Sequence, residues 1–378
     1  MKKYFIHIAV FLLILMPASK AAYIDTDAEV AVVIDGHTGK VLFSKNKDKK
    51  TYPASMTKIM TTLIIFEKLA NETLSLDDKF LVSEKAWRER EGSSMFVEVD
   101  KEIRVEDLLR GIIVQSGNDA CIVVAENIAG TEESFAKMMT QKAKEIGMKN
   151  TNFTNSTGMY DKDNYSTVYD IALLSMHLIN EYPQYYHLFA ETEFEWSGIK
   201  QNNRNSLLYK NMGVDGLKTG HLSKSGYGLA ASAVDQNRRV ISVVNGFESI
   251  QKRTQGSSRL ITWAFREFTN LKLFEKDNIV GQVEILSASN KASDVSTPEE
   301  IVITIPKSKR DELITNIVVD ENISAPLNAG DKVGYLEISI PGEENQSYEL
   351  YATNSIDRSN IFIRFYNYLI NLILSLFN

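Results

Sequence analysis

The spacing of apolar residues changes twice along the first part of the chain, and this change constrains the fold more than any other feature of the sequence. Residues 29–44, EVAVVIDGHTGKVLFS, are typical of two short strands around a polar turn. From Met56 the apolar residues recur at spacings of three and four, which predicts a helix that ends near Asn71.

The same two patterns then repeat in order, first helical and later extended. Helical periods occupy 105–114, 118–130, 132–148 and 167–182, strand periods occupy 214–221, 226–234 and 238–247, and a last helix is expected from about Arg253 to Phe268. Strands on both sides of a helical block predict one α+β domain whose terminal strands share an antiparallel sheet. We expect this domain to span residues 22–272.

Beyond Leu273 the sequence consists of short extended runs separated by turns. The runs lie at 280–286, 300–306, 314–320 and 332–341, with NAGDK and PGEEN among the turns. They predict a small all-β domain, a sandwich or a barrel, over residues 273–356. No nucleophile, general base or set of metal ligands stands out in it, so we expect a spacer or docking role.

The first residues have the pattern of a secretory signal peptide. A lysine pair precedes an apolar run from Tyr4 to Met16, and small residues lead to a cleavage site near Ala22. We expect residues 1–21 to be removed on export; an uncleaved membrane anchor is the alternative, although the run is short for a membrane span.

The last residues have the pattern of an amphipathic helix. On a helix, the polar residues of SNIFIRFYNYLINLILSLFN form one narrow stripe, and the rest of the surface is apolar. The stripe consists of Asn360, Arg364, Asn367, Asn371, Ser375 and Asn378. We expect residues 357–378 to anchor the protein in a membrane interface. A packed core helix and a transmembrane span are the alternatives.

Charge and residue usage exclude several classes of protein. The formal charge is −7, and removal of Lys2, Lys3 and Lys20 with the signal peptide makes it −10, so nucleic acid is a poor candidate partner. The lone Cys121 lies in an apolar stretch and is interpreted as a buried structural residue rather than a nucleophile. His37, His177 and His187 lack metal-ligand spacing, so no metal is expected.

A loose dinucleotide pattern, GYGLAA at 226–231, also carries no cofactor. It continues as a strand, whereas the dinucleotide-binding motif opens a helix. No phosphate-binding loop of the Walker type is present in the sequence either. We therefore expect the protein to work without a cofactor.

The first candidate for chemistry is Ser55 with Lys58, in YPASMTKIMT. Spacing alone is weak evidence, because Ser134, Ser197 and Ser249 also precede a lysine by three residues. Context favours Ser55, which stands where a helix begins and has Lys58 one turn further on the same face. A neutral lysine there could accept the serine proton if burial or another cation lowered its pKa.

Two further motifs have an ordinary structural interpretation when each is taken alone. Ser116, Gly117 and Asn118 lie between two helical runs and could form only a helix C-cap followed by an N-cap. Lys218 to Gly220 lie in a strand, where Lys-Thr-Gly could be an exposed residue next to a bulge. Taken together and in this order, however, such motifs are the signature of penicillin-binding proteins and class A β-lactamases.

The chain resembles the low-molecular-mass penicillin-binding proteins that are D-alanyl-D-alanine carboxypeptidases. The resemblance rests on YPASMTKIMT, EGSSMFVEV, GIIVQSGNDACIVVAE, FTNSTGM, YSTVYDIALL, VDGLKTGHLSKSGYGLAASA and SSRLITWAF, which together cover roughly residues 24–272. The β-rich region and the amphipathic end are similar to the second domain and membrane anchor of that family. Ser-Gly-Asn in place of Ser-Asp-Asn, and no ExxLN segment, separate the chain from class A β-lactamases.

The resemblance implies a role for each residue of the three motifs. It implies that Ser55 is the nucleophile, that Lys58 is its general base and that Ser116 relays a proton to the leaving amine. It also implies that Asn118 holds Lys58 and the substrate amide. Substrate-binding roles are implied for Lys218, Thr219, Gly220, His221 through its backbone N–H, and Arg253, whose alignment is less secure beside Lys252.

The implied activity is removal of the terminal D-alanine from peptidoglycan pentapeptides, with β-lactams as covalent inhibitors of Ser55. The implied location is the periplasmic face of the inner membrane. A D,D-endopeptidase or a weak β-lactamase on the same fold is an alternative within the enzyme class. A catalytically idle, membrane-bound scaffold that binds wall peptides is an alternative of another class.

Overall fold

The computed structural model describes residues 24–359 except 89–90, 286–287, 289–291 and 322. The predicted signal peptide at 1–21 lies outside the described residues, and so does the predicted anchor from residue 360 onward. The chain divides into a larger unit, Ile24–Asp277 with Glu299–Ile305, and a smaller unit that includes Asn278–Pro298 and the described residues from Pro306 onward.

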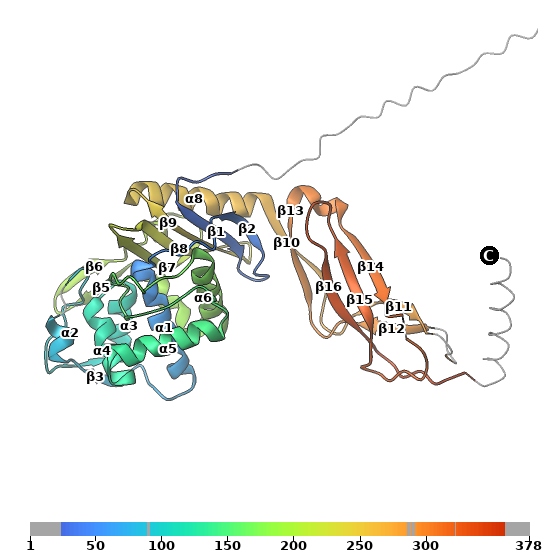
Figure 1. Cartoon of the computed structure of the whole chain (residues 1–378), viewed down its shortest axis with the longest axis horizontal. Coiled ribbons are helices and arrows are strands. Elements are labelled where there is room, and N and C mark those ends of the chain that lie inside the picture. Colours follow the sequence, from blue (N-terminus) through green and yellow to red (C-terminus); the bar gives the residue numbers. More distant parts are fainter. Residues whose placement is uncertain (1–23, 89–90, 286–287, 289–291, 322, 360–378) are drawn as a thin grey trace, which may run out of the picture. The chain divides into compact units, whose positions relative to one another are not determined.

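An antiparallel sheet of five strands forms the centre of the larger unit (Figure 1). The strands are β1 (Val30–Asp35), β2 (Val41–Lys45), β7 (Val214–Leu222), β8 (Gly226–Asp235) and β9 (Arg238–Phe247), in the order β2-β1-β9-β8-β7. Within this sheet, the first strand in sequence order, β1, pairs with the last, β9, and Val32 lies opposite Val243. The predicted sharing of one sheet by strands from both ends of the domain is confirmed, and β7 is left at an edge.

Helices cover both faces of this sheet, as Figure 1 shows. One face packs against α8 (Ile250–Glu267), and the other faces the block of α1 (Lys58–Ala70), α3 (Val105–Ile113), α4 (Asn118–Ala129), α5 (Glu132–Glu145) and α6 (Val168–Glu181). Successive side chains of a strand point to opposite faces. Val32 and Ile34 of β1 therefore pack into the core with α1, whereas Ala31 and Val33 pack into the core with α8.

The helices begin where hydroxyl side chains can satisfy their free N–H groups. Thr131, Thr167 and Ser249 each accept a hydrogen bond from the backbone N–H three residues later, at the start of α5, α6 and α8. The cap at Ser249 explains why α8 begins three residues before the predicted Arg253.

Shorter elements of the larger unit were not predicted. They are the strand pairs β3 (Lys79–Leu81) with β4 (Glu102–Arg104) and β5 (Glu193–Trp196) with β6 (Ile199–Asn202), the helices α2 (Glu84–Arg88) and α7 (Pro183–Tyr186), and the one-turn 3₁₀ segments η1 (Ala54–Thr57), η2 (His187–Ala190) and η3 (Ser206–Tyr209). Elements of three to five residues are too short to show a period.

The smaller unit contains a second antiparallel sheet, which confirms the predicted all-β character of this region. Its strands are β11 (Ile279–Glu284), β12 (Ala292–Ser296), β14 (Ile314–Val319), β15 (Lys332–Ser339) and β16 (Gln346–Ala352), in the order β11-β12-β16-β15-β14, and a 3₁₀ segment, η4, covers Lys307–Glu312. In a separate pair, β10 (Phe268–Phe274) joins β13 (Ile301–Pro306), which assigns residues 299–305 to the larger unit.

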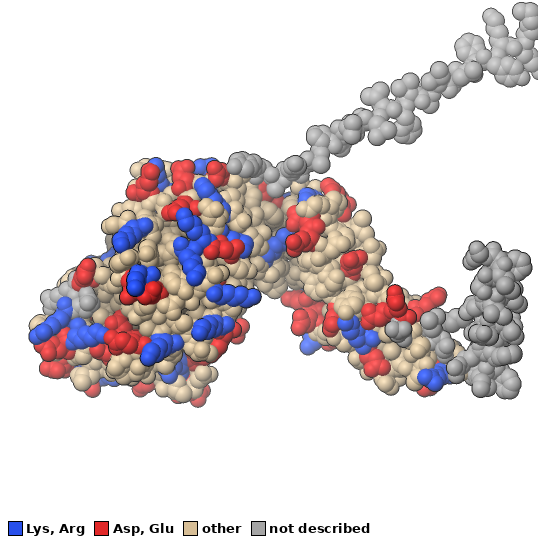
Figure 2. Space-filling view, viewed as in Figure 1, with Lys and Arg blue, Asp and Glu red and all other residues tan. Residues whose placement is uncertain are grey.

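Charged side chains of both signs alternate over the visible face of the larger unit (Figure 2). Many form surface ion pairs, such as Lys142 with Glu67 and Glu145 at 2.7 and 2.9 Å. Each exposed pair of this kind stabilises a protein by only about 0–1 kcal/mol. The packing of the helical block around α1 is therefore expected to contribute more to stability.

Phe66 tests this expectation. Its side chain is fully buried on α1, with ring centroids of Tyr185 at 5.3 Å and Phe189 at 6.3 Å. We expect Phe66→Ala to lower the free energy of unfolding by about 3–5 kcal/mol, because it removes a ring and leaves a cavity. The control Ile250→Ala alters a side chain that is 56% exposed and should change it by less than about 0.5 kcal/mol. Urea unfolding measures both, and equal effects would contradict the expectation.

Candidate active site

Ser55 and Lys58 meet at the start of α1. Ser55 lies in η1, the 3₁₀ turn Ala54–Thr57, which continues directly into α1 at Lys58. Lys58 Nζ lies 3.3 Å from Ser55 Oγ. The serine is half-buried and the lysine is 1% exposed, so the hydroxyl can be reached from outside while the amine is shielded from water.

The other serines that precede a lysine by three residues have ordinary structural positions, including Ser44, which precedes Lys47 and is exposed on β2. Ser249 caps α8, Ser134 N bonds the Thr131 side chain at the start of α5, and Ser197 lies in the turn between β5 and β6. Among these serines, Ser55 is the one whose lysine is buried.

Lys58 has two strong hydrogen-bond acceptors besides the serine. Its Nζ donates to Asn118 Oδ1 at 2.7 Å and to the backbone carbonyl of Thr157 at 2.5 Å. Burial is the largest influence on the Lys58 amine and lowers its pKa. Cys121 opposes this by a smaller amount, and the positive charge of Arg204 adds a further lowering effect. A neutral amine whose two N–H groups bond Asn118 and Thr157 has its lone pair left for the serine proton.

Ser116 and Asn118 lie in the turn between α3 and α4. Ser116 has φ 62°, an unusual backbone conformation for a residue with a side chain, and is 1% exposed. Its Oγ has no hydrogen-bond partner among the described residues. Asn118 bonds Lys58 through Oδ1 and the Glu91 carbonyl through Nδ2, at 2.8 Å. The structure therefore brings Asn118 onto Lys58 and leaves the Ser116 hydroxyl free to bond a bound molecule.

Lys218, Thr219 and Gly220 lie on the edge strand β7, beside η1. Lys218 is 3% exposed, and burial, followed by the charges of Lys58 and Arg204, lowers its pKa well below the usual value. Thr219 is also buried. A Cβ at Gly220 would lie 2.8 Å from the Pro53 carbonyl, so glycine lets the strand approach the turn that carries Ser55. The resemblance implied a substrate-binding role for Gly220, and this close backbone approach is an additional role.

His221 and Arg253 occupy different surroundings. The His221 side chain is exposed and stacks on Tyr227, with the ring centroids 4.0 Å apart, and the role implied for this residue is that of its backbone N–H. Arg253 is 4% exposed on α8, and its Nη2 donates to the Arg204 carbonyl at 3.3 Å. Burial lowers the pKa of Arg253 to about 10.

Sequence reasoning did not find three groups that contact this site. The Thr157 and Glu91 carbonyls are backbone atoms, for which residue type gives no signal. Arg204 is exposed overall, yet its charge lowers the pKa of Lys58 and of Lys218. The Gly158 that follows Thr157 has φ 82° and lies against the Ala54 carbonyl, so the FTNSTGM segment packs directly on η1.

Cys121, on α4, is fully buried. Burial raises the pKa of its thiol to about 12, so the thiolate that a nucleophile needs is disfavoured. The structure therefore agrees with its interpretation as a structural residue.

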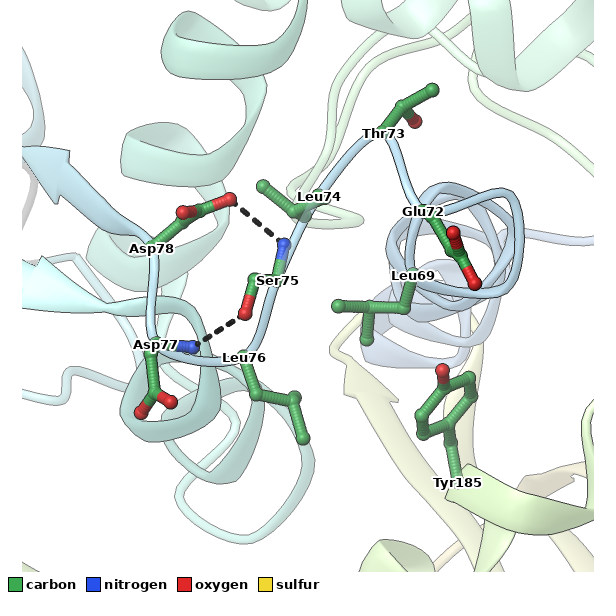
Figure 3. Close-up of a pocket in the computed structure, with 9 residues that line it drawn as sticks. All are labelled: Leu69, Glu72, Thr73, Leu74, Ser75, Leu76, Asp77, Asp78 and Tyr185. Carbon is green, nitrogen blue, oxygen red and sulfur yellow. Dashed lines mark hydrogen bonds between the residues drawn. The ribbon is translucent and has the colours of Figure 1, made fainter.

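A separate pocket of about 530 Å³ lies at the other end of α1 (Figure 3). Leu69, Asp77, Asp78 and Tyr185 are among its lining residues, and Asp78 Oδ2 accepts the Ser75 backbone N–H at 2.8 Å. Leu69 is eleven residues after Lys58, which corresponds to about 16 Å along a helix. The pocket contains none of the predicted site residues.

The described part of the chain contains neither a cluster of metal ligands nor a helix suited to crossing a membrane. Among residues 24–359 outside the gaps, no cluster of three or more His, Cys, Asp or Glu side chains could hold a metal ion. Within the same residues, no helix combines the length and the apolar character that crossing a membrane requires.

The hydroxyl of Ser55 contacts a buried lysine of lowered pKa, an arrangement that suits acyl transfer by a serine nucleophile. Comparison with known families agrees: residues 16–249 match the D-alanyl-D-alanine carboxypeptidase family, and residues 268–358 match the C-terminal domain of penicillin-binding protein 5. The chain belongs to the D-alanyl-D-alanine carboxypeptidase family. The predicted family, fold class and type of enzyme, a serine carboxypeptidase, are confirmed.

Individual relatives extend this similarity over both units. The D-alanyl-D-alanine carboxypeptidase DacA of Haemophilus influenzae is 34% identical over 356 residues, 93% of this chain and 91% of the relative. The crystal structure of penicillin-binding protein 5 from Haemophilus influenzae has a TM-score of 0.84 at 34% identity and covers 90% of this chain and 100% of that chain. The ampicillin-bound form of penicillin-binding protein D2 from Listeria monocytogenes has a TM-score of 0.59 at 29% identity and covers 65% of this chain and 99% of that chain.

The lowered pKa values predict a bell-shaped pH dependence for acylation of Ser55 by a penicillin. Lys58 accepts a proton only when it is neutral, so the rate should rise with pH through a midpoint below 10.5. The rate should fall again as Lys218 loses the charge that attracts a carboxylate. Intact-mass kinetics from pH 5 to 10 measure both limbs.

Arg204→Gln distinguishes this explanation from a general pH effect. It removes a positive charge that lowers both pKa values, so both limbs should move to higher pH. Arg266→Gln is the control, since Arg266 is 62% exposed and pairs with Glu267. Limbs that do not move in Arg204→Gln would contradict the assignment.

Proposed function

We propose that this protein removes the terminal D-alanine from peptidoglycan pentapeptides through an acyl-enzyme on Ser55. The observation that carries the proposal is the contact of the Ser55 hydroxyl with a buried lysine of lowered pKa, at 3.3 Å. Lowering the pKa of the lysine favours its neutral form, which can take the serine proton as the nucleophile attacks. The names of the relatives, which are D-alanyl-D-alanine carboxypeptidases, support the choice of substrate.

The proposed acylation starts with attack of Ser55 Oγ on the carbonyl carbon of the penultimate D-alanine, while Lys58 Nζ accepts the hydroxyl proton. The carbonyl oxygen becomes an oxyanion that the backbone N–H groups of Ser55 and His221 stabilise. The tetrahedral intermediate then collapses, the C–N bond breaks, and the proton passes through the Ser116 hydroxyl to the leaving amine of D-alanine.

Deacylation repeats the same proton transfers with water as the nucleophile. Water attacks the ester carbonyl, Lys58 accepts its proton, and the ester C–O bond breaks as Ser55 Oγ is protonated. The products are the shortened peptide and the free enzyme, so atoms and charges balance over the two half-reactions.

Cationic groups near β7 suit the terminal carboxylate of the substrate. Lys218 and Arg253 are both buried, and a carboxylate that binds them replaces some of the hydration that burial removes. The Thr219 hydroxyl can donate a further hydrogen bond. As an edge strand, β7 can also pair with the extended backbone of a peptide, and Asn118 lies where its Nδ2 or Oδ1 can bond a substrate amide.

β-Lactams are the proposed covalent inhibitors. Their strained amide presents a carbonyl and a carboxylate in an arrangement similar to that of D-Ala-D-Ala, so Ser55 should attack it in the same way. The likeness to a penicillin-binding protein in its ampicillin-bound form supports this part of the proposal.

The proposed location is the periplasmic face of the inner membrane. This part rests on the sequence of residues 1–21, which has the pattern of a signal peptide, and of residues 357–378, which has the pattern of an interfacial amphipathic helix. The membrane is then a partner of the chain end, and the wall peptide is the partner of the active site.

Mass spectrometry tests the nucleophile and the activity together. After brief exposure to benzylpenicillin, the purified soluble domain should gain one adduct that peptide mapping places on Ser55, and Ser55→Ala should gain none. The same preparation should release D-alanine from diacetyl-Lys-D-Ala-D-Ala. Folded protein that shows neither adduct nor release would favour the wall-peptide scaffold, while rapid loss of the adduct would favour a β-lactamase.

Truncation tests the proposed anchor. A chain that ends before Ser359 should remain in the supernatant when membranes are pelleted, because it lacks the apolar surface that would bind the interface. Its activity on the soluble tripeptide should stay within about 2-fold of that of the full chain. Pelleting of the truncated protein with membranes would show that the anchor lies elsewhere.

A further inference from the structure

The carboxylate of Asp119 binds an unusual number of donors next to the active site. Asp119 follows Asn118 in the first turn of α4 and is 1% exposed. It accepts hydrogen bonds from Ser94 Oγ at 2.6 Å and from the backbone N–H groups of Met95, Phe96 and Val97 at 2.8, 2.7 and 3.1 Å. A fifth comes from Ala120 N at 2.9 Å.

Most of these donors belong to another segment of the chain. An acidic residue in the first turn of a helix usually interacts with the N–H groups of that helix. Of the five donors of Asp119, only Ala120 lies in α4, and the other four lie in residues 94–97. The carboxylate therefore serves mainly to fold residues 94–97 around itself.

The same segment is attached to the residue that holds the base. Asn118 N donates to the Ser93 carbonyl at 2.7 Å, and Asn118 Nδ2 donates to the Glu91 carbonyl at 2.8 Å. A Cβ at Gly117 would lie 3.0 Å from Met95 N, so glycine permits this close approach. Because Asn118 Oδ1 bonds Lys58 Nζ, residues 91–97 fix the amide that orients the base.

Residues 91–97 also connect to the β7 side of the site. Gln201 Nε2 donates to the Ser94 carbonyl at 3.0 Å, and the Arg204 guanidinium donates to Ser93 Oγ. The charge of Arg204 acts on both Lys58 and Lys218. Asp119 thus holds a segment that contacts both the residue orienting Lys58 and the arginine that lowers its pKa.

We propose that Asp119 is a positioning residue for acyl transfer: by holding residues 94–97, its carboxylate keeps Asn118, and through it Lys58, in line with Ser55. The proposal rests on the function proposed above, in which Lys58 is the base. Asp119 makes no hydrogen bond to Ser55, and in this role it acts on the geometry of proton transfer. Its charge also raises the pKa of Lys58, so losing that charge would favour the neutral base and could not by itself slow acylation.

Asp119→Asn tests the role with the smallest change of shape. An amide has one oxygen acceptor, and its NH₂ group would face backbone N–H donors, so the segment must shift. Since a misplacement of about 1 Å can cost about 100-fold in rate, we expect the rate constant for acylation at saturating benzylpenicillin to fall by about 100-fold. The concentration giving half-saturation should change by less than about 3-fold. Rates are measured by intact mass at a temperature where circular dichroism shows the variant folded.

Asp170→Asn is the matched control. Asp170, on α6, is also a buried carboxylate. It accepts hydrogen bonds from Asn150 N at 2.8 Å and from Thr151 Oγ1 at 2.7 Å. It makes no hydrogen bond to residues 91–97. Its variant should lower the melting temperature but leave the acylation rate within about 2-fold of the unaltered protein. A purely structural role for Asp119 would make the two variants behave alike.

Ser94→Ala provides a milder variant in case Asp119→Asn does not fold. It removes one donor of Asp119, at 2.6 Å, and should lower the acylation rate by about 3- to 10-fold. If folded Asp119→Asn is acylated as fast as the unaltered protein, the proposed role of Asp119 is wrong. If Asp119→Asn does not fold, an unchanged acylation rate in Ser94→Ala has the same meaning. In either case an adduct on Ser55 would still support the proposed function. Absence of an adduct in the unaltered protein overturns the proposed function and, with it, the role of Asp119.

Discussion

The burial of one amine, that of Lys58, is the constraint on which the rest of the site depends. The Lys58 side chain is 1% exposed, so its ammonium group has lost the water that stabilises the charge, and the neutral form becomes more stable relative to the charged form. A neutral amine still needs partners for its N–H groups, and the structure supplies Asn118 Oδ1 and the Thr157 carbonyl. With both N–H groups occupied, the lone pair is directed to the remaining neighbour, the Ser55 hydroxyl at 3.3 Å.

The positive charges around the site act together although the chain as a whole is acidic, with a formal charge of −7. The charge of Arg204 makes protonation of both Lys58 and Lys218 less favourable, and the charge of Lys58 does the same to Lys218. In the proposed reaction, the terminal carboxylate of a bound substrate adds a negative charge among them and so raises the pKa of Lys58. The free enzyme therefore favours a neutral base, and the bound substrate then favours the transfer of a proton to it.

The sequence predicted those parts of the fold that repeat over many residues. The long helices and the central strands have eight or more residues or a clear alternation, and their order predicts the shared sheet. Strand β12, ASDVS, consists mostly of small and polar residues, and β10 follows α8 without a turn signal, so neither showed a strand period. The pairing of β10 with β13 joins distant segments and could not be predicted from local pattern.

The candidate site also contains residues that the sequence could identify and contacts that it could not. Ser55, Lys58, Asn118 and Lys218 could be found because side-chain chemistry distinguishes them within short motifs. The partners of these residues could not, since many are backbone carbonyls, such as Thr157 and Glu91. Asp119 was visible in the motif QSGND, but an acid in the first turn of a helix is so common that its four bonds to residues 94–97 gave no sequence signal.

Main-chain contacts also explain why the site needs glycine at fixed positions. Gly220 lies against the Pro53 carbonyl and Gly158 against the Ala54 carbonyl, so at both a Cβ would collide with backbone. At Gly117 a Cβ would lie 2.8 Å from Asp119 Oδ1 and 3.0 Å from Met95 N, which is also too close without a shift. Strand β7 and the segment around Gly158 therefore approach η1, the turn that carries Ser55, and residues 94–97 approach the start of α4, at distances that a side chain on the glycine would prevent. Backbone cannot adjust as a flexible side chain can, so these contacts fix the relative positions of Ser55, Asn118 and β7. The proposed chemistry uses side chains, but the alignment of these side chains depends on glycines, which lack a Cβ and so allow the backbone segments to approach one another.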